Sequence, residues 1–104
     1  MNEYIKPILE VSKACVTVRK TASGLVTHRP AYVFFISSCP TDGAALYEGA
    51  VHNGETSGAD VLIDIERQYG QDHSQLALPV YFNRGIYLAL TTNMKSITIQ
   101  YLEE

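Results

Sequence analysis

Short segments in which apolar and polar residues alternate are the feature that most constrains how this chain folds. Val61, Ile63 and Ile65 alternate with polar residues, and only Leu62 departs from the pattern. Successive side chains of a strand point to opposite faces of a sheet, so alternation is typical of a half-buried strand. Together with the turns between them, such segments predict strands at Lys13–Arg19, Tyr32–Ser38, Ala44–Glu48, Asp60–Glu66, Leu76–Phe82, Ile86–Thr91 and Ser96–Tyr101.

The segment Ala59–Tyr69 is the best helical alternative in the sequence. It is rich in β-branched residues, its apolar residues recur at every second position, and Gly58 and Gly70 flank it closely. Because β-branched side chains lose rotamer freedom in a helix and a period of two matches a strand, we expect a strand here.

Residues that favour turns separate the predicted strands. Cys39–Gly43 combines a proline, which presets φ, with a glycine, which tolerates positive φ, and Asn83–Gly85 and Thr92–Lys95 have similar turn chemistry. These three turns predict three hairpins between strands that are neighbours in the sequence. Longer polar loops are expected at Ala22–Ala31, Asn53–Ala59 and Gln68–Ser74.

Seven or eight short strands with frequent turns predict an all-β fold, a two-layer antiparallel β-sandwich with a jelly-roll-like arrangement. The 104 residues, of which 46% are hydrophobic and 18% charged, have the size and composition of one globular domain. We therefore expect a single domain over residues 1–104, with residues 1–10 as an extended N-terminal arm.

Charge and the N-terminal sequence exclude two kinds of partner. The net charge is −3, and the eight Lys and Arg residues are scattered without forming the basic stripe of a nucleic-acid-binding protein. Residues 1–10 lack the apolar run of a secretory signal or a membrane span. We expect synthesis in the cytoplasm, with neither nucleic acid nor membrane as a partner.

The chain has two cysteines, Cys15 and Cys39. A hairpin with its turn near Val26 and Thr27 would place them almost opposite each other, where a disulfide could form. In a cytosolic chain, two buried thiols are the favoured alternative.

No group of residues in the sequence predicts catalysis. His28, His52 and His73 lie in or beside polar segments without the spacing of a metal pair, so we expect solvated loop histidines. Cys15 lies in mid-strand without the helix N-terminus or basic cluster that would activate it as a nucleophile, so packing is the favoured role.

Carboxylates and glycines give no stronger signal. Asp60, Asp64 and Glu66 are expected on one exposed strand face, and with Glu55 they offer a calcium site as the alternative. The glycine-containing loop His52–Gly58 lacks the lysine of a phosphate cradle. The sequence therefore predicts no catalytic, cofactor-binding or metal-binding residues, and no cofactor.

The segment Tyr32–Ile36 breaks the alternation, because both of its faces are apolar. A strand of this kind is covered on both sides, either inside its own domain or by a neighbouring subunit. Each sheet of a small sandwich normally leaves one face to water, so a subunit interface is favoured. The predicted interface residues are Tyr32, Val33, Phe35, Tyr81 and Tyr87, whereas Phe34, Phe82 and Tyr101 are assigned to the core.

The region from about residue 32 to residue 102 resembles a group of small phage and prophage structural proteins. In that group a strand ends in an alanine-x-leucine-tyrosine-x-glycine unit before a polar loop, an aliphatic strand and a closing pair of strands. The matching residues are Ala44–Gly49, the loop through Gly58, the strand Val61–Ile65, and the closing segments Val80–Leu88 and Ile97–Tyr101. The longer Gln68–Ser74 loop departs from the pattern.

The resemblance implies a non-enzymatic virion or assembly protein that acts through symmetric self-association and docking on a larger assembly. The expected partners are further copies of the chain, with a trimer as the favoured number, and other virion or assembly proteins. The chain would then be incorporated into a virion after synthesis. The alternative is a ligand-binding sandwich for carbohydrate or calcium that uses tyrosines and the loops carrying His52, Glu55 and His73. An enzyme ranks third and requires a pocket that gathers histidine and carboxylate.

Overall fold

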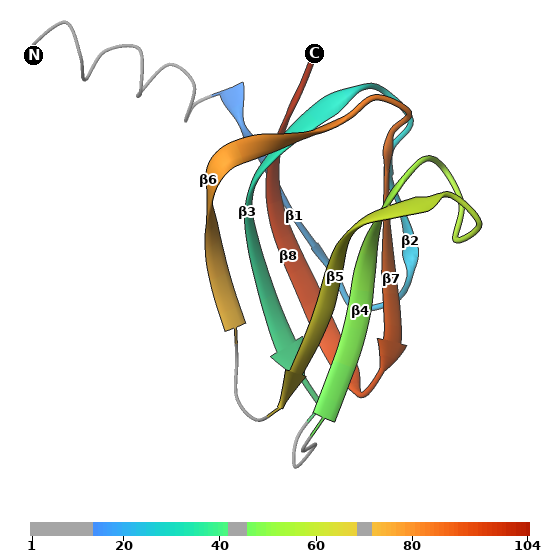
Figure 1. Cartoon of the computed structure of the whole chain (residues 1–104), viewed down its shortest axis with the longest axis vertical. Coiled ribbons are helices and arrows are strands. Elements are labelled where there is room, and N and C mark those ends of the chain that lie inside the picture. Colours follow the sequence, from blue (N-terminus) through green and yellow to red (C-terminus); the bar gives the residue numbers. More distant parts are fainter. Residues whose placement is uncertain (1–13, 42–45, 69–71) are drawn as a thin grey trace, which may run out of the picture.

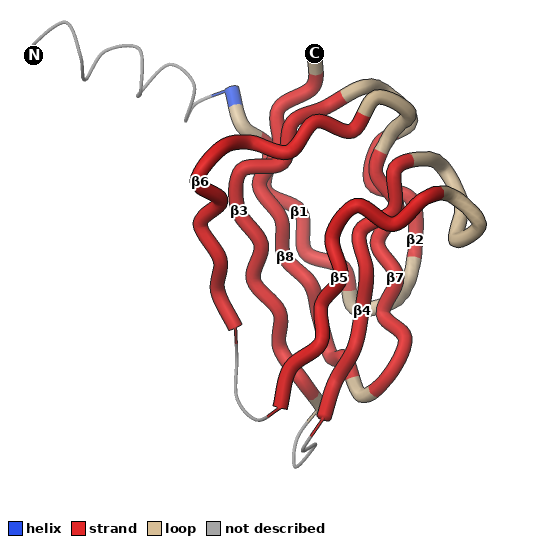
Figure 2. Tube along the Cα trace, viewed as in Figure 1, coloured by secondary structure: helices blue, strands red, loops and turns tan. Residues whose placement is uncertain are grey.

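The computed structural model describes residues 14–41, 46–68 and 72–104, so the expected arm at residues 1–10 lies outside the described residues. The described residues form eight strands in two four-stranded sheets, which confirms the all-β sandwich (Figure 1). The strands are β1 (Val16–Lys20), β2 (Gly24–Thr27), β3 (Ala31–Pro40), β4 (Leu46–Asn53), β5 (Asp60–Gln68), β6 (Asp72–Phe82), β7 (Ile86–Thr92) and β8 (Met94–Glu103). Figure 2 shows that strands make up most of this part of the chain and that the loops between them are short.

The connectivity is that of a jelly roll. Sheet A has the strand order β1-β8-β3-β6, sheet B has the order β2-β7-β4-β5, and every hydrogen-bonded pair is antiparallel. Apart from β4 and β5, strands that follow each other in sequence lie in different sheets. The first and last strands pair with each other, which closes the domain through contacts that are remote in sequence.

The three predicted hairpins are wrong. The connections from β3 to β4, from β6 to β7 and from β7 to β8 all pass from one sheet to the other. Turn chemistry specifies a reversal of direction, but packing over the whole core decides which strand becomes the partner. Within the described chain, β4 and β5 are the only consecutive strands that pair, and the predicted long loop joins them.

Each of the three predicted loops includes residues that belong to strands. Strand β2 lies inside the predicted Ala22–Ala31 loop, β4 continues to Asn53, and β6 begins at Asp72. His52 and His73 are therefore strand residues rather than loop residues. Strand β2 has only four residues and pairs with β7 through an irregular register, so it leaves no clear alternation in the sequence.

The core lies between the two sheets. It includes the predicted core residues Phe82 and Tyr101, whereas Phe34 is only half-buried at a bulge in β3. The fully buried large side chains of the core are Tyr47, Phe82, Ile86, Leu88, Ile97, Ile99, Val33 and Val51. Burying one such aliphatic or aromatic side chain stabilises a fold by about 1.5–3 kcal/mol, so these inward positions hold the two sheets together.

The two cysteines are free and half-buried, and the hairpin expected around them is wrong. Strand β8 lies between β1 and β3, and it pairs Val16 with Tyr101 at one end and Cys39 with Ser96 towards the other. At about 3.3 Å per residue, the cysteines lie roughly 20 Å apart along the strands, well beyond the reach of a disulfide.

Candidate functional site

The outer face of sheet A carries a group of half-exposed apolar side chains. Tyr32 of β3 pairs with Tyr81 of β6 on one side and with Leu102 of β8 on the other. A bulge after Val33 lets Phe35, opposite Gln100, return to the outward side before the buried Ile36. We call the four residues Tyr32, Phe35, Tyr81 and Leu102 the aromatic face.

Two contacts hold the tyrosines of the aromatic face in place. The Tyr32 and Tyr81 rings lie 4.8 Å apart between centroids with a tilt of 32°, a geometry that aromatic pairs favour. The hydroxyl of Tyr81 donates a hydrogen bond to the Glu104 carboxylate, and this bond, with burial and the charge of Glu104, raises the pKa of Tyr81 to about 12. Tyr81 is nevertheless 41% exposed, so much of its ring faces solvent.

The five predicted interface residues fall into three places. Tyr32, Phe35 and Tyr81 share the aromatic face, and their contact with a partner remains a prediction. Val33 must be corrected, because it is 0% exposed and belongs to the core between the sheets. Tyr87 lies on sheet B, where it pairs with Leu25 and His52, so it cannot join the other three in one surface. The sequence shows that both faces of the Tyr32–Ile36 segment are apolar. It does not show which of these side chains point into the core.

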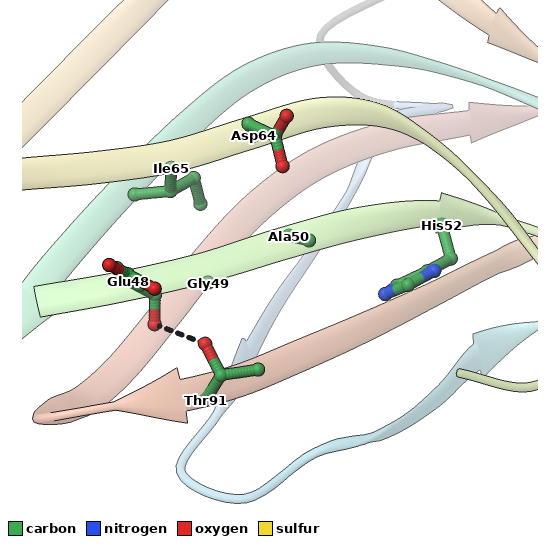
Figure 3. Close-up of a pocket in the computed structure, with 7 residues that line it drawn as sticks. All are labelled: Glu48, Gly49, Ala50, His52, Asp64, Ile65 and Thr91. Carbon is green, nitrogen blue, oxygen red and sulfur yellow. Dashed lines mark hydrogen bonds between the residues drawn. The ribbon is translucent and has the colours of Figure 1, made fainter. Parts of the chain in front are cut away.

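A depression on sheet B is the other candidate site, and we call it the hollow. It has a volume of about 330 Å³ and is lined by Glu48, Gly49, Ala50, His52, Asp64, Ile65 and Thr91. Ala50 pairs with Ala89, and both alanines are buried yet lie outside the core cluster between the sheets. Figure 3 shows Asp64, Glu48, His52 and Thr91 arranged around Ala50. Small residues at the centre and longer side chains around them create the depression.

His52 forms one end of the hollow and is fixed in position. It is only 7% exposed, its Nδ1 atom lies 2.8 Å from the carbonyl oxygen of Ala59, and its ring meets Tyr87 edge-on with 5.8 Å between centroids. A carbonyl only accepts, so Nδ1 carries the proton in the neutral ring and Nε2 carries the lone pair. The nitrogen at the far end of the ring points towards Ala50 (Figure 3). The prediction of a solvated loop histidine is wrong for His52, because this residue is a buried part of β4.

The prediction that Asp60 and Asp64 share one face of β5 is wrong. Leu62 is the extra residue of a bulge, so Asp60 pairs with Asn53 whereas Asp64 pairs with Ala50. The single departure from alternation at Leu62 is the sequence signal of this bulge. Asp64 lines the hollow, together with Glu48 of β4.

The hollow does gather a histidine with carboxylates, which an enzyme would need. The hydroxyl of Thr91, however, donates to the main-chain oxygen of Glu48 at 3.1 Å and not to His52, so it is not arranged as an activated nucleophile (Figure 3). Among the described residues, no three His, Cys, Asp or Glu side chains gather closely enough to hold a metal ion.

The part of the chain that is described contains no helix long and apolar enough to cross a membrane. No family model, no curated protein and no solved structure matches this chain.

Proposed function

We propose that this chain is a non-enzymatic structural or assembly protein that associates with copies of itself through the aromatic face and docks on a larger assembly. The proposal includes the virion role that the resemblance to phage structural proteins implies, with a homotrimer as the expected form. Jelly rolls serve as capsid and lectin domains, so the fold is compatible with this role but does not by itself select it.

The observation that carries the proposal is the aromatic face. Tyr32, Tyr81, Phe35 and Leu102 come from three adjacent strands, and each leaves part of its apolar surface uncovered. Contiguous apolar patches are uncommon on monomeric soluble proteins and mark interaction sites. Tyrosines are favoured at interfaces because a rigid ring loses little entropy on contact and its hydroxyl still finds a partner.

The test is the mass of the chain in solution, measured by sedimentation equilibrium over a range of concentrations. We expect the wild-type chain to be oligomeric and the double variant Tyr32→Ser, Tyr81→Ser to shift towards monomer. Leu25→Ser is the matched control, because Leu25 is equally exposed, at 41%, on the opposite sheet. A wild-type monomer at high concentration, or equal loss of mass in the control, would overturn the proposal.

A further inference from the structure

We propose that the aromatic face receives residues 4–11 of a neighbouring copy, which we call the N-terminal segment. This inference rests on the proposed self-association and names the part of the chain that makes the contact. The contact is head-to-tail, because each copy gives its segment to the next copy and receives one. Head-to-tail contacts close into rings, as the expected trimer requires.

The aromatic face is too small to hold two copies together by itself. It consists of four residues on β3, β6 and β8. A stable interface of ordinary size takes roughly 20–30 residues from each partner and buries about 800 Å² on each. A contact between two aromatic faces would supply only a small part of such an interface, so further residues are needed.

The sequence before β1 supplies apolar side chains for this contact. Five of the eight residues of the N-terminal segment are apolar, namely Tyr4, Ile5, Ile8, Leu9 and Val11. Side chains of this kind gain free energy when they leave water for an apolar surface. The segment therefore has the composition of a chain that docks on rings rather than of a solvated tail.

The N-terminal segment joins the domain beside the aromatic face. Strand β1 is an edge strand of sheet A, and its first residue, Val16, pairs with Tyr101. The next residue of β8 is Leu102, which pairs with Tyr32, and Tyr32 pairs with Tyr81. The chain therefore enters β1 at the same end of sheet A as the aromatic face, as Figure 1 shows for β1, β8 and β3.

The direction of the chain favours the face of a neighbouring copy over that of the same copy. Because β1 and β8 are antiparallel, the chain enters β1 from beyond the C-terminal end of β8. To cross its own sheet A it would have to reverse within a few residues. Residues 8–15 contain no glycine, proline, asparagine or aspartate, the residues that favour such reversals. The segment is therefore directed away from its own sheet and towards a second copy.

The aromatic face matches aliphatic side chains in chemistry and size. The contact of Tyr32 with Tyr81 and the hydrogen bond from Tyr81 to Glu104 hold the rings in place, and Tyr81 is still 41% exposed. Fixed rings lose little further freedom when an isoleucine or leucine packs on them. The three strands of the face span about 10 Å, whereas eight extended residues reach about 26 Å, so the N-terminal segment is long enough to cross it.

Substitutions in the full chain test the contact by sedimentation equilibrium. The double variant Ile8→Ser, Leu9→Ser should weaken association about tenfold or more, because two side chains lose their apolar contact. The matched control is Lys6→Ser, Glu10→Ser, which changes two polar residues of the same segment, keeps the net charge and should leave association unchanged. Adding Tyr32→Ser, Tyr81→Ser to the first variant should weaken association little further, since both changes remove one contact.

Paramagnetic broadening identifies the copy whose segment occupies the face. A nitroxide is attached through Glu10→Cys to a chain in which both native cysteines are replaced by serine. This chain is mixed with an equal amount of isotope-labelled wild-type chain. We expect signals of the labelled copy to broaden most strongly at Tyr32 and Tyr81, and less at Leu25 on the opposite sheet.

The outcomes separate this inference from the proposed function, once amide dispersion shows that the variants are folded. An oligomer that Ile8→Ser, Leu9→Ser leaves intact would overturn the inference but not the self-association. Broadening that requires nitroxide and isotope label on the same chain would show that each segment covers its own copy, and would also overturn it. Equal weakening in the polar control, or strongest broadening at Leu25, would exclude an apolar contact with the aromatic face. A monomeric wild-type chain would overturn both proposals.

Discussion

The two outer faces of the sandwich are built from the same kind of antiparallel sheet but present opposite surfaces. Sheet A displays rings, with Tyr32 and Tyr81 in contact and Tyr81 tied to Glu104. Sheet B has Ala50 and Ala89 at corresponding outward positions, which leaves the hollow with acceptors at its edges. One face carries the contacting tyrosine rings, and the other carries the hollow beside the exposed Leu25 and Val61.

This difference shows which positions of such a fold are constrained by the core and which are not. Inward positions of both sheets must fill one core, and they carry similar aliphatic and aromatic residues. Outward positions contribute little to that core, so their contrast is not explained by stability. The two faces therefore differ in what they can contact, and the aromatic face is the one that we propose for self-association.

Truncation of an inward residue should have the largest effect on stability. Leu88 is 0% exposed on β7, and Leu88→Ala should lower the free energy of unfolding by about 2–5 kcal/mol, because it removes buried methyl groups and leaves a cavity. Leu25→Ala, the same change on the outer side of the neighbouring strand, should change stability by less than about 0.5 kcal/mol. Urea denaturation of both variants measures the contrast, and equal losses would break the division into inward and outward positions.

Gly49 and Ala50 allow the same comparison at adjacent residues of β4. A Cβ atom at Gly49 would lie 2.8 Å from the carbonyl oxygen of Ala89 and 2.9 Å from the Cε atom of Met94. Gly49→Ala should therefore destabilise the domain by about 1–3 kcal/mol through overpacking. Ala50→Val enlarges a side chain on the side of the hollow instead, and it should cost less stability than Gly49→Ala. Thermal unfolding followed by circular dichroism compares them, and a greater loss in Ala50→Val would contradict the assigned faces.

A smaller effect is expected from the pH dependence of the aromatic face. The hydrogen bond to Glu104 raises the pKa of Tyr81 from 10.0 to about 12, so the folded chain favours the neutral phenol. This contribution to stability is complete below pH 10.0 and is lost as the pH rises to about 12, because the unfolded chain releases the proton first.

Tyr81→Phe should remove that part of the alkaline loss of stability. Denaturant unfolding of the wild-type chain and the variant on either side of pH 10.0 gives the comparison. Identical pH profiles for the two chains would show that Tyr81 and Glu104 are not coupled in solution.

The alternation of the sequence predicted the fold class and most strands, because burial of one sheet face is a local requirement repeated along the chain. It missed β2, whose apolar residues Leu25 and Val26 are adjacent rather than alternating. It also mistook turns between sheets for hairpins, since strand partners such as β1 and β8 are decided by packing between distant segments.

The candidate sites were predicted only in part. The aromatic run Tyr32–Ile36 was visible because it violates alternation, but the inward direction of Val33 depends on the whole core. The hollow was not visible, because its residues come from β4, β5 and β7 and are adjacent only through sheet register. The departure at Leu62 was the one local sign of the bulge that separates Asp64 from Asp60.

The most direct test of the two-face account is to compare the solvent contact of both faces as the chain associates. Relaxation of side-chain protons by a soluble paramagnetic agent can be measured at low and high protein concentration. The account predicts that the ring protons of Tyr32 and Tyr81 become shielded at high concentration, while the methyl protons of Leu25 and Val61 on sheet B stay accessible. Shielding of Leu25 and Val61 with Tyr32 and Tyr81 still accessible would contradict it.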